Sequence, residues 1–533
     1  MSDLALARTA LRRFARATNL LLAGRSFRVL GDDGQADALR RVMIACGGRG
    51  VAGSPDYVFA SAGSTWDRAA QADASVVVDA SGTLELPATA RPSARDGILE
   101  VDDVQVVSAA PSLPARAALP AAAGRIEWAS SKMPLTASLA HDLRDDGLVA
   151  GRRIAVSMVL EPKTAVLALA LRDAGADVAV FAHHYETDDA VARELRDRGV
   201  PVFADGSGDA GSDRVLALRL LDTEPQLLLD DGAHVIRLAH RERPTLVEAM
   251  LGAAEETTSG IRAVRALGDE LRMPVIAVND AVTKTRFDNR YGTGQSCVFA
   301  IADTLEAASA ELRVASFDGA RVIVIGFGPV GQGVAQFSAA LGGHVSVCDI
   351  DPRAELEARY AGYETGSAAD LVAGADIVIS ATGVARTVPQ DLLELAPDGT
   401  VFAVAGGVDD EIEVGRLRAV TDVAAVDDHV ETFTFADGRS IAVIDDGGCV
   451  NITAGEGNPI EIMDLSFAAQ LQAVRALVTA SERRVGLFAL SVDADREVAR
   501  RALDTAGGNG HGGCGEGRGS NRDTDNRIQG ATA

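Results

Sequence analysis

Runs of apolar, largely β-branched residues alternate with amphipathic helical segments along most of this chain. The clearest case is Ala320–Pro352, where the runs Val322–Ile325 and Val345–Val347 flank a helix-forming segment. Further apolar runs follow within Ala375–Gly383 and Val401–Ala405. Short apolar runs of this kind are typical of parallel strands that are covered on both faces. The pattern predicts an α/β fold.

A glycine-rich turn joins the first strand of this unit to the helix. Gly326, Gly328 and Gly331 form GxGxxG, in which glycines permit a tight turn, close approach of a pyrophosphate and tight helix packing. The helix directs its first N–H groups at the phosphates. Asp349 ends the next strand, where a carboxylate accepts ribose hydroxyls and repels a 2′-phosphate. The order of these elements predicts a Rossmann domain that binds NAD rather than NADP.

The same alternation appears earlier in the chain, from Arg125 onward. It predicts a β-α-β-α unit made of Ile154–Met158, Thr164–Asp173, Val178–Phe181 and Asp188–Arg198. A further strand over Gln226–Leu229 runs into Asp230 and Asp231. Because open α/β sheets hold their ligands at the carboxyl ends of strands, this region is predicted to be a substrate-binding domain.

The N-terminal region resembles a weakened copy of the Rossmann unit. Ala23–Pro55 repeats its helix, and Ala74–Gly82 repeats the pattern of Ala375–Gly383. Two of the three loop glycines are replaced, and the carboxylates of Asp32 and Asp33 would repel a pyrophosphate. We therefore expect a degenerate Rossmann-like domain that binds no dinucleotide and serves in packing, in oligomerisation or as a lid.

Composition completes the domain plan. Residues 85–124 are rich in Pro, Ala and Ser, which predicts a linker, and residues 506–533 are rich in Gly and Asn, which predicts a disordered tail. The Rossmann domain is then inserted between two parts of the substrate domain. The predicted units are 1–84 (degenerate Rossmann-like), 85–124 (linker), 125–295 (substrate domain), 296–445 (NAD domain), 446–505 (return to the substrate domain) and 506–533 (tail).

Charge and residue usage limit the possible partners. The net charge of −25 disfavours nucleic acid and anionic membranes, and no long apolar run predicts a membrane span or secretion signal. The five cysteines are scattered, so neither a disulfide framework nor a metal site is expected, and a cytoplasmic location fits. Lysine occurs only at Lys132, Lys163 and Lys284, against 48 arginines. These positions can be due to chance. The alternative is that each lysine lies at a site where the cation must be compact or must be able to lose its proton.

Two further strings carry candidate chemistry. They are EETTSG at residues 255–260 and VNDAVTKTRFDNRYG at residues 278–292. With LLLDDG, GFGPVGQG and CVNITAGEGNP, they closely resemble the S-adenosylhomocysteine hydrolase family over most of residues 125–490. The resemblance implies a small nucleoside-like substrate, a homo-oligomer and transient oxidation of a ribose 3′-hydroxyl by bound NAD. That oxidation acidifies C4′–H and permits loss of the 5′ substituent.

The resemblance also implies roles for single residues. Lys284 matches the family's base for the 3′-hydroxyl, which requires neighbours that bring the amine near neutrality, and Asp288 matches its partner. Glu256 and Asp231 match carboxylates that hold the ribose hydroxyls and handle the C4′ proton, and Asn289 lies beside the nicotinamide. Taken alone, Lys284 and Asp288 would be interpreted as a solvated salt bridge. The predicted cofactor-binding residues are Thr257, Thr258, Ser259, Gly326, Gly328, Pro329, Val330, Gly331, Gln332, Gly333, Asp349, Thr382, Gly406 and Asn451.

The chain departs from the family where the 5′ group and the base would bind. The replaced positions are Val159 and Gly407 for two histidines, Thr293 for a cysteine, Asn458 for an adenine-binding histidine, and Glu161 and Lys163 for a threonine and a glutamate. The family's C-terminal lysine/tyrosine tail is absent as well. Lys163 inverts the local charge, which suits an anionic or carbonyl-bearing substrate edge better than an amino group. His183, His184, Glu161 and Glu456 remain as candidates for proton transfer, each with a structural role as the alternative.

Three functions remain open from the sequence. The first is an adenosylhomocysteinase-like enzyme that eliminates, hydrolyses or dehydrates at C4′/C5′ of a nucleoside or its thioether, with hydrolysis of S-adenosylhomocysteine itself as one form. The second is a catalytically silent NAD-binding regulatory relative. The third, a 2-hydroxyacid dehydrogenase, is disfavoured because no histidine follows the Rossmann unit in a suitable string; His429 is expected to be exposed.

Overall fold

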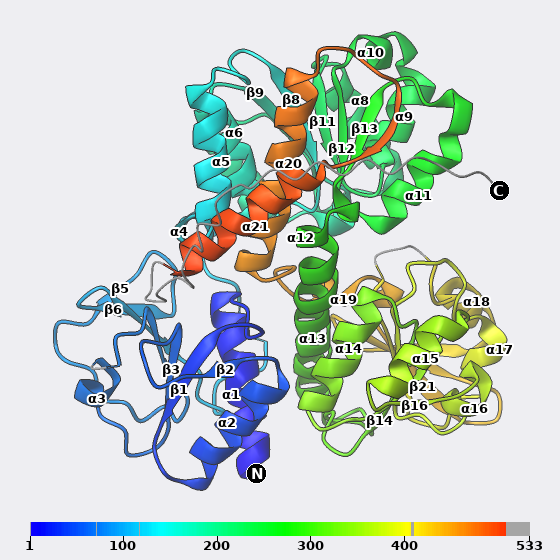
Figure 1. Cartoon of the computed structure of the whole chain (residues 1–533). Helices are drawn as coiled ribbons and strands as arrows, with labels where there is room; N and C mark the ends of the chain where they lie inside the picture. The colour runs from blue at the N-terminus through cyan, green and yellow to red at the C-terminus, as the bar shows by residue number, and fades with distance from the viewer. Residues whose placement is uncertain (1, 71, 117, 407–409, 508–533) are drawn as a thin grey trace, which may run out of the picture.

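The computed structural model describes residues 2–70, 72–116, 118–406 and 410–507. These residues form three α/β units, each with its own sheet (Figure 1). In that view the substrate unit lies at the top, the N-terminal unit at lower left and the Rossmann unit at lower right. The predicted α/β class is confirmed. Gly407 and most of the predicted disordered tail lie outside the described residues.

The sheet of the substrate unit is parallel throughout. Its strands, in spatial order, are β10 (Val202–Phe203), β9 (Asp177–Phe181), β8 (Arg153–Ser157), β11 (Leu227–Asp230), β12 (Gly252–Glu255), β13 (Pro274–Ala277) and β22 (Gly486–Ala489). The chain passes outward from β8 to β10 and then places β11 on the other side of β8. At such a reversal of strand order, the carboxyl ends of the strands border a ligand-binding crevice.

Helices cover both faces of this sheet and close its carboxyl edge. The larger ones are α4 (Ala122–Ser131), α5 (Pro134–Asp145), α6 (Pro162–Asp173), α7 (Asp189–Asp197), α8 (Ala210–Leu221), α9 (His234–Glu242), α10 (Pro244–Ala249), α11 (Thr258–Leu267), α20 (Ile460–Thr479) and α21 (Val492–Gly507). Four short segments follow strand ends: η1 (His184–Glu186), η3 (Val278–Asp280), α12 (Val282–Lys284) and the π-helix η4 (Thr285–Gly292).

The Rossmann unit combines a parallel sheet with an antiparallel edge. Its spatial order is β16 (Glu364–Thr365), β15 (His344–Cys348), β14 (Arg321–Ile325), β17 (Ile377–Ser380), β18 (Val401–Val404), β21 (Ser440–Ile444), β20 (Val430–Thr434) and β19 (Asp422–Asp427). Its helices are α13 (Thr293–Ala307), α14 (Pro329–Ala340), α15 (Pro352–Tyr360), α16 (Ala368–Val372), α17 (Gln390–Leu393), α18 (Val414–Val420) and α19 (Val450–Thr453). Strand order reverses between β14 and β17, beside the glycine loop.

The sheet of the N-terminal unit also has seven strands, and it extends beyond the predicted boundary at residue 84. The order is β2 (Arg49–Gly50), β1 (Ser26–Leu30), β3 (Tyr57–Ala60), β4 (Val76–Asp79), β7 (Val104–Ser108), β6 (Ile98–Val101) and β5 (Arg91–Pro92), with helices α1 (Asp3–Thr18), α2 (Gly34–Ala45) and α3 (Trp66–Ala70). Much of the predicted linker 85–124 is therefore folded, because β7 pairs with β4 and adds a hairpin to the sheet. The Pro-rich composition hid the short strands β6 and β5, of which β5 forms the edge of the sheet.

At the start of α2 the N-terminal copy has lost the open turn of a dinucleotide site. Asp33 caps the helix, and its carboxylate accepts a hydrogen bond from the backbone N–H of Ala36 at 2.7 Å. A carboxylate fills the position where an anion would otherwise bind the free N–H groups. The geometry agrees with the expectation that this unit binds no pyrophosphate.

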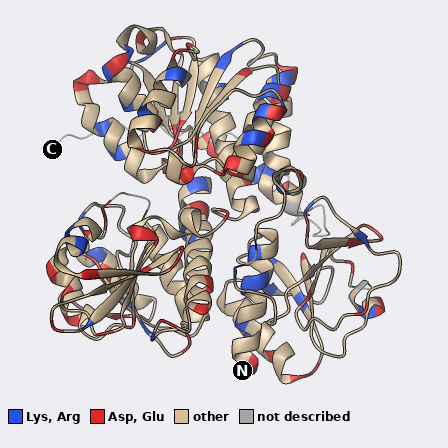
Figure 2. Cartoon of the chain, turned by 180° about the vertical axis from the view of Figure 1, so that it is seen from behind, with Lys and Arg blue, Asp and Glu red and all other residues tan. Residues whose placement is uncertain are grey.

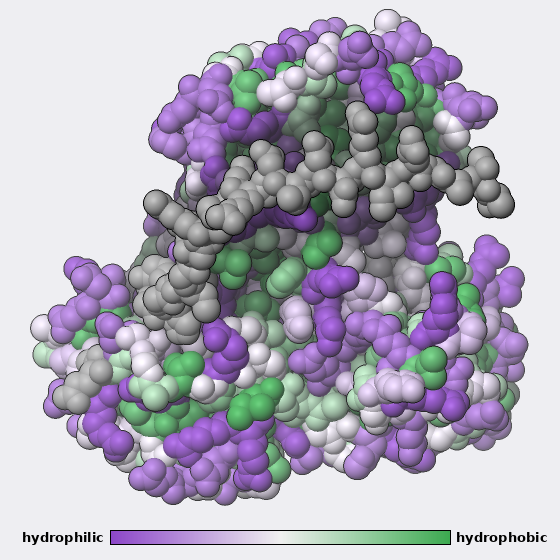
Figure 3. All heavy atoms as spheres, in the orientation of Figure 1, coloured by the Kyte–Doolittle hydropathy of each residue, from purple (hydrophilic) through white to green (hydrophobic). Residues whose placement is uncertain are grey.

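Charged residues of both signs are spread over all three units (Figure 2). The face in Figure 3 is mainly hydrophilic, with apolar residues scattered among polar ones. Among the described residues, none of the helices has the length and apolar character that a membrane span requires.

Candidate active site

Three segments with predicted catalytic residues follow neighbouring strands of the substrate sheet. Asp231 follows β11, Glu256 follows β12, and Lys284 lies in α12 after β13. Since these strands are parallel neighbours, their carboxyl ends lie at one edge. That edge faces the Rossmann unit across α12 (Figure 1).

The amine of Lys284 is the centre of a buried polar cluster. Its Nζ lies 2.9 Å from Oδ2 of Asp288 and 3.8 Å from Oε1 of Glu256, and it donates a hydrogen bond of 3.1 Å to Oδ1 of Asn289. The side chains of Lys284, Asp288 and Glu256 are at most 6% exposed. The predicted pair is thus buried rather than a solvated salt bridge. The π-helix places Asp288 and Asn289 on the same side of Lys284.

The electrostatics of the cluster differ from the prediction that neighbouring groups bring the pKa of Lys284 near neutrality. Burial acts to lower the pKa of Lys284, but Asp288 and Glu256 outweigh it and raise the pKa above its ordinary value. Burial raises the pKa of Glu256 to about 7, although the ammonium of Lys284 opposes the rise. Burial likewise raises the pKa of Asp231, against the charge of Lys284. These effects favour the charged form of Lys284, and burial brings the pKa of Glu256, like that of Asp230, close to neutral pH.

Residues of the C-terminal return hold Asp288 and Glu256 in place. Asn458 donates from its amide to Asp288, and Ser466 of α20 donates to Oδ2 of Asp288 at 3.1 Å. Gln470, one helical turn after Ser466, donates to Glu256. The sequence analysis missed Ser466 and Gln470. The available signal was two polar residues four positions apart in an otherwise apolar helix, both of which are buried.

Asn451, a predicted cofactor residue, joins the same network. Its amide donates to Oδ1 of Asn458 at 2.9 Å, and that oxygen also accepts a bond from Ser296 at 2.8 Å. Asn458, which replaces a family histidine, therefore connects Asn451 to Asp288. The segment after β21 and the lysine-bearing segment form one hydrogen-bonded unit.

The glycine loop has the open backbone that a dinucleotide needs. Gly326 has φ of 95°, and a Cβ at Gly331 would lie 1.9 Å from the carbonyl oxygen of Gly326. Beside Gly328 the space is empty to 4 Å, and no side chain caps α14. Asp349 lies at this turn, where it accepts hydrogen bonds from the N–H groups of Phe327 and Asp351 at 2.7 and 2.8 Å. A close backbone approach, an uncapped helix and an adjacent carboxylate fit NAD.

A glycine contact joins this loop's helix to the lysine-bearing segment. A Cβ at Gly333 of α14 would lie 1.8 Å from the carbonyl oxygen of Arg290, and one at Gly294 would lie 2.7 Å from Gly333. Gly333, predicted to bind cofactor, therefore permits contact between backbones. Only glycine on both sides lets α14 lie directly against the π-helix that holds Asp288. This contact places the dinucleotide turn and the Lys284 cluster on adjoining elements.

Of the other predicted cofactor residues, Thr257 and Thr382 lie on loops, Thr258 and Ser259 lie in α11, and Pro329, Val330 and Gln332 lie in α14. Thr257 caps α11 and donates from its hydroxyl to Glu255 at 2.8 Å, while Thr258 is exposed. Arg262, further along α11, donates to the carbonyl oxygen of Gly383 and so links the two domains. Near Gly383 lies Glu411, which the sequence analysis missed. It accepts bonds from the Thr382 hydroxyl and from the Gly383 N–H at 3.0 and 2.9 Å.

Comparisons with known proteins agree with this architecture. A family model described as "S-adenosyl-L-homocysteine hydrolase" matches residues 119–244, and one described as its "NAD binding domain" matches residues 289–457. The adenosylhomocysteinase of Thermotoga maritima is 36% identical over 389 residues, which are 72% of this chain and 94% of that protein. The S-inosyl-L-homocysteine hydrolase of Methanothermobacter thermautotrophicus is 37% identical over 72% of this chain and 91% of its own length.

The chain belongs to the S-adenosyl-L-homocysteine hydrolase family. It is an NAD-binding enzyme of that family, and the predicted family, cofactor and enzymatic character are confirmed. Relatives with the adenosyl and the inosyl name are equally similar, so overall identity does not decide the base. Residues 1–118 match neither family model.

In this hydrolase-family chain, the positions predicted to contact the base form a buried ion cluster. Glu161 caps α6, and its Oε2 lies 2.7 Å from Nζ of Lys163. The same ammonium donates at 2.5 Å to the backbone oxygen of Glu456. The Glu456 carboxylate lies 2.5 Å from Arg95 and 3.2 Å from Arg125. Burial acts to raise the pKa of Glu456, but Arg95 and its neighbours outweigh burial and lower the pKa to about 2.

Arg95 belongs to the N-terminal unit, so a domain outside the family models reaches the centre of this family member. Its side chain is 2% exposed and also donates at 2.6 Å to the carbonyl oxygen of Ala17. The segment that holds Arg95 lies in the predicted linker, which explains why the sequence analysis did not find it. The cluster joins the extra domain to the loop that carries Glu456 and Asn458.

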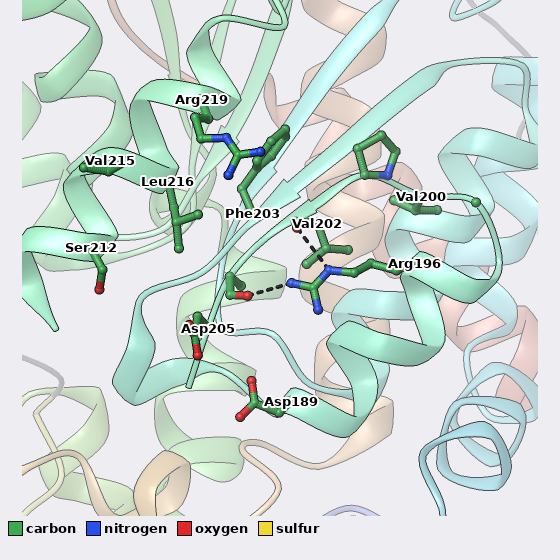
Figure 4. Close-up of a pocket in the computed structure, with 13 residues that line it drawn as sticks. Asp189, Arg196, Val200, Val202, Phe203, Asp205, Ser212, Val215, Leu216 and Arg219 are labelled. Carbon is green, nitrogen blue, oxygen red and sulfur yellow. Dashed lines mark hydrogen bonds between the residues drawn. The ribbon is translucent and has the colours of Figure 1, made fainter. Parts of the chain in front are cut away.

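A separate pocket of about 950 Å³ lies at the outer edge of the substrate sheet (Figure 4). It is formed by β10, α7 and α8, and Arg196 forms part of its wall by donating to the carbonyl oxygens of Val202 and Ala204 at 3.3 and 2.6 Å. None of the predicted site residues lines it. The family's chemistry is expected at the reversal of strand order between β8 and β11 rather than here.

Proposed function

We propose that the protein transiently oxidises the 3′-hydroxyl of a nucleoside thioether and then cleaves or forms the bond at C5′, as a hydrolase or lyase. The observation that carries this proposal is the buried cluster of Lys284, Asp288, Glu256 and Asn289, next to the helix of the dinucleotide turn. Burying an ammonium and two carboxylates is costly, and a regulatory relative without catalysis would gain nothing from it. The cluster thus favours an enzyme over a silent relative.

The glycine loop, Asp349 and the loops of Thr257, Thr382 and Asn451 would hold NAD. When bound, NAD supplies the oxidant for a secondary alcohol. Residues of the chain then move protons. Lys284 can accept the 3′-hydroxyl proton only after its ammonium has lost one. Oε1 of Glu256, which lies 3.8 Å away and has no hydrogen-bond partner, is placed to take it. Asp231 faces the same ammonium and would hold a ribose hydroxyl.

This role of Glu256 predicts a pH dependence. The carboxyl must be ionised to accept a proton, and burial raises its pKa to about 7. We expect kcat/KM to rise with pH between about 6 and 8, and Glu256→Gln to abolish this rise. Initial rates across that range test the assignment. A profile that is flat between these values in the wild type would contradict it.

Lys163 favours a carbonyl-bearing base, as in inosine. An ammonium has three N–H donors and no acceptor. Glu161 and the Glu456 backbone take two of its donors, at 2.7 and 2.5 Å. The third can donate to a carbonyl oxygen but is repelled by the amino hydrogens of adenine. We therefore infer that a purine nucleoside thioether with a 6-oxo base is preferred.

Two substrates test the proposal directly. With NAD bound, S-inosylhomocysteine is expected to raise the absorbance near about 340 nm and to release thiol, with kcat/KM about tenfold or more above that for S-adenosylhomocysteine. Lys163→Met should remove the preference, while Lys132→Met, a change in the N-terminal part of the substrate unit, should keep it. No absorbance change with either substrate would contradict the proposed oxidation. An equal or reversed preference would contradict the assignment of the base.

A further inference from the structure

The two positions where the family carries histidines hold Val159 and Gly407 here, yet a different loop brings histidines to the same edge. Val159 follows β8, and the next residue, Leu160, is bonded to the loop after β9. Its N–H donates to the carbonyl oxygen of Glu186 at 2.9 Å, and its own carbonyl oxygen accepts from Asp188 at 3.0 Å. That loop contains His183 and His184. The segment that has lost a histidine thus lies against one that carries two.

His183 has the geometry of an oriented imidazole. Its Nδ1 lies 3.1 Å from Oδ2 of Asp213, a residue of α8 whose side chain is 5% exposed. Its Nε2 is buried and has no hydrogen-bond partner within the part of the chain that the structure describes. The ring is further held by stacking on Tyr185 and by edge contacts with Phe181 and His234, with centroids 5.5, 5.1 and 4.6 Å apart. A buried nitrogen without a partner requires an explanation, and a carboxylate on the opposite nitrogen is how proteins orient a histidine base.

His183 lies on the side of Asp231 away from β12. Its ring contacts that of His234, at the start of α9, three residues after Asp231. In the sheet, β9, which precedes His183, lies on one side of β11, and β13, which precedes Lys284, lies on the other. The charges of both side chains act to lower the pKa of Asp231, against the larger effect of burial. The η1 segment also contacts α19, which carries Asn451. His183 and Lys284 thus approach Asp231 at the same carboxyl edge of the sheet, from strands on opposite sides of β11.

We propose that His183, oriented by Asp213, exchanges the proton with the 5′ leaving group and with the incoming water. The inference rests on the proposed function. In the elimination, Asp231 takes the C4′ proton, the C5′–S bond breaks, and sulfur leaves with the electron pair and receives the Nε2 proton of the imidazolium. Neutral His183 then removes a proton from water as the oxygen adds to C5′ and Asp231 returns its proton to C4′, which restores the imidazolium and the carboxylate. Asp213 is a positioning residue, because it acts through Nδ1.

Of the three neighbouring histidines, His183, His184 and His234, His183 is the one best suited to transfer this proton. His184 also contacts Oδ2 of Asp213, at 2.8 Å, but its side chain is 29% exposed, against 20% for His183. Unlike Nε2 of His183, its Nε2 is not a buried atom that lacks a hydrogen-bond partner. Burial and the charge of His183 lower the pKa of His234 to about 4, so His234 is neutral near pH 7. Asp213 and Asp231 face His183, and Asp209, at the start of α8, also interacts with the charge of His184.

The test separates the two halves of the reaction. His183→Gln is expected to keep the substrate-induced absorbance change and to release thiol about 100-fold more slowly, at the low end of acid–base effects because thiolate is a good leaving group. Asp213→Asn should likewise keep the absorbance change and slow thiol release, because the imidazole loses the carboxylate that orients it through Nδ1. His141→Gln, on an exposed face of α5, is the matched control and should match the wild type.

The outcomes distinguish failure of the proposed function from failure of the role assigned to His183. If the wild type gives no absorbance change with either thioether, the proposed function fails, and this inference fails with it. If the wild type reacts and His183→Gln releases thiol at the wild-type rate, the inference alone is wrong. Should His183→Gln unfold, Asp213→Asn decides: thiol release at the wild-type rate overturns the assignment. Loss of the absorbance change in folded His183→Gln would place the residue in the redox half and would also overturn it.

Discussion

Lys284→Met is expected to lower kcat/KM by about 10⁴-fold, at the upper end of acid–base contributions, because no other described side chain combines an amine with this position. The substitution also leaves Asp288, Glu256 and Asp231 around an apolar side chain. Loss of one partner from a buried charge cluster costs about 3–5 kcal/mol of unfolding free energy. Steady-state kinetics and urea unfolding measure the two effects separately.

The control is the double variant Lys284→Met/Asp288→Asn. Removing both charges should restore much of the unfolding free energy, since the buried carboxylate no longer lacks its cation, but should restore no activity. A single variant that keeps more than about a tenth of the wild-type kcat/KM would show that the amine takes no part in proton transfer. A double variant as unstable as the single one would show that the pair contributes through packing instead.

Glu456→Gln is expected to lower the unfolding free energy by about 3–5 kcal/mol near pH 7, because Arg95, Arg125 and Lys163 lose their shared anion in a buried site. The pH dependence follows from the pKa of Glu456, which is about 2 in the folded chain and 4.5 in its ordinary state. A carboxyl with a lowered folded pKa adds stability above its ordinary pKa and loses it as the pH falls toward the folded value. The shift corresponds to about 3 kcal/mol.

Denaturant unfolding at pH values from about 6 down to 2 checks this prediction. The wild type should lose stability more steeply than Glu456→Gln between about pH 4.5 and 2, and the two curves should converge at the acid end. Glu127→Gln, on the adjacent α4 and with an exposed side chain, serves as the control. Curves that stay parallel to pH 2 would contradict the assigned pKa.

The sequence predicted local structure where one pattern determined it. The apolar run Ile154–Met158 became β8 at Arg153–Ser157, and Asp188–Arg198 became α7 at Asp189–Asp197, because β-branched runs and capped amphipathic segments act through near neighbours. The linker prediction failed because β5 and β6 are two and four residues long and depend on pairing with β7. Composition does not record such pairing.

In the candidate site too, features set by local sequence were predicted and features set by long-range contacts were not. The string around Lys284 and Asp288 led to a pair that is buried and 2.9 Å apart. Ser466 and Gln470, which bond to this cluster, and Arg95, which bonds to Glu456, were missed because each reaches its partner from a distant segment of the chain. The charge state of Lys284 was also not predictable, since it depends on three carboxylates delivered by different strands. The identity of the site residues could be predicted from the sequence. Their electrostatic interactions could not, because these depend on how the strand ends come together at one edge of the sheet.

The substrate and Rossmann units are connected by only two stretches of chain, one at α13 and one between α19 and α20, and the N-terminal unit is bonded to both (Figure 1). On the first stretch, Arg13 lies 3.2 Å from Asp303 and 2.5 Å from Glu306. On the second, Arg95 holds Glu456, and Tyr57 donates to Glu461 at 3.1 Å. The added domain is thus bonded to both connections between the two units. A rotation of one unit against the other at either connection would disturb the ion pairs that anchor the N-terminal unit, which adds an energetic cost to such a movement.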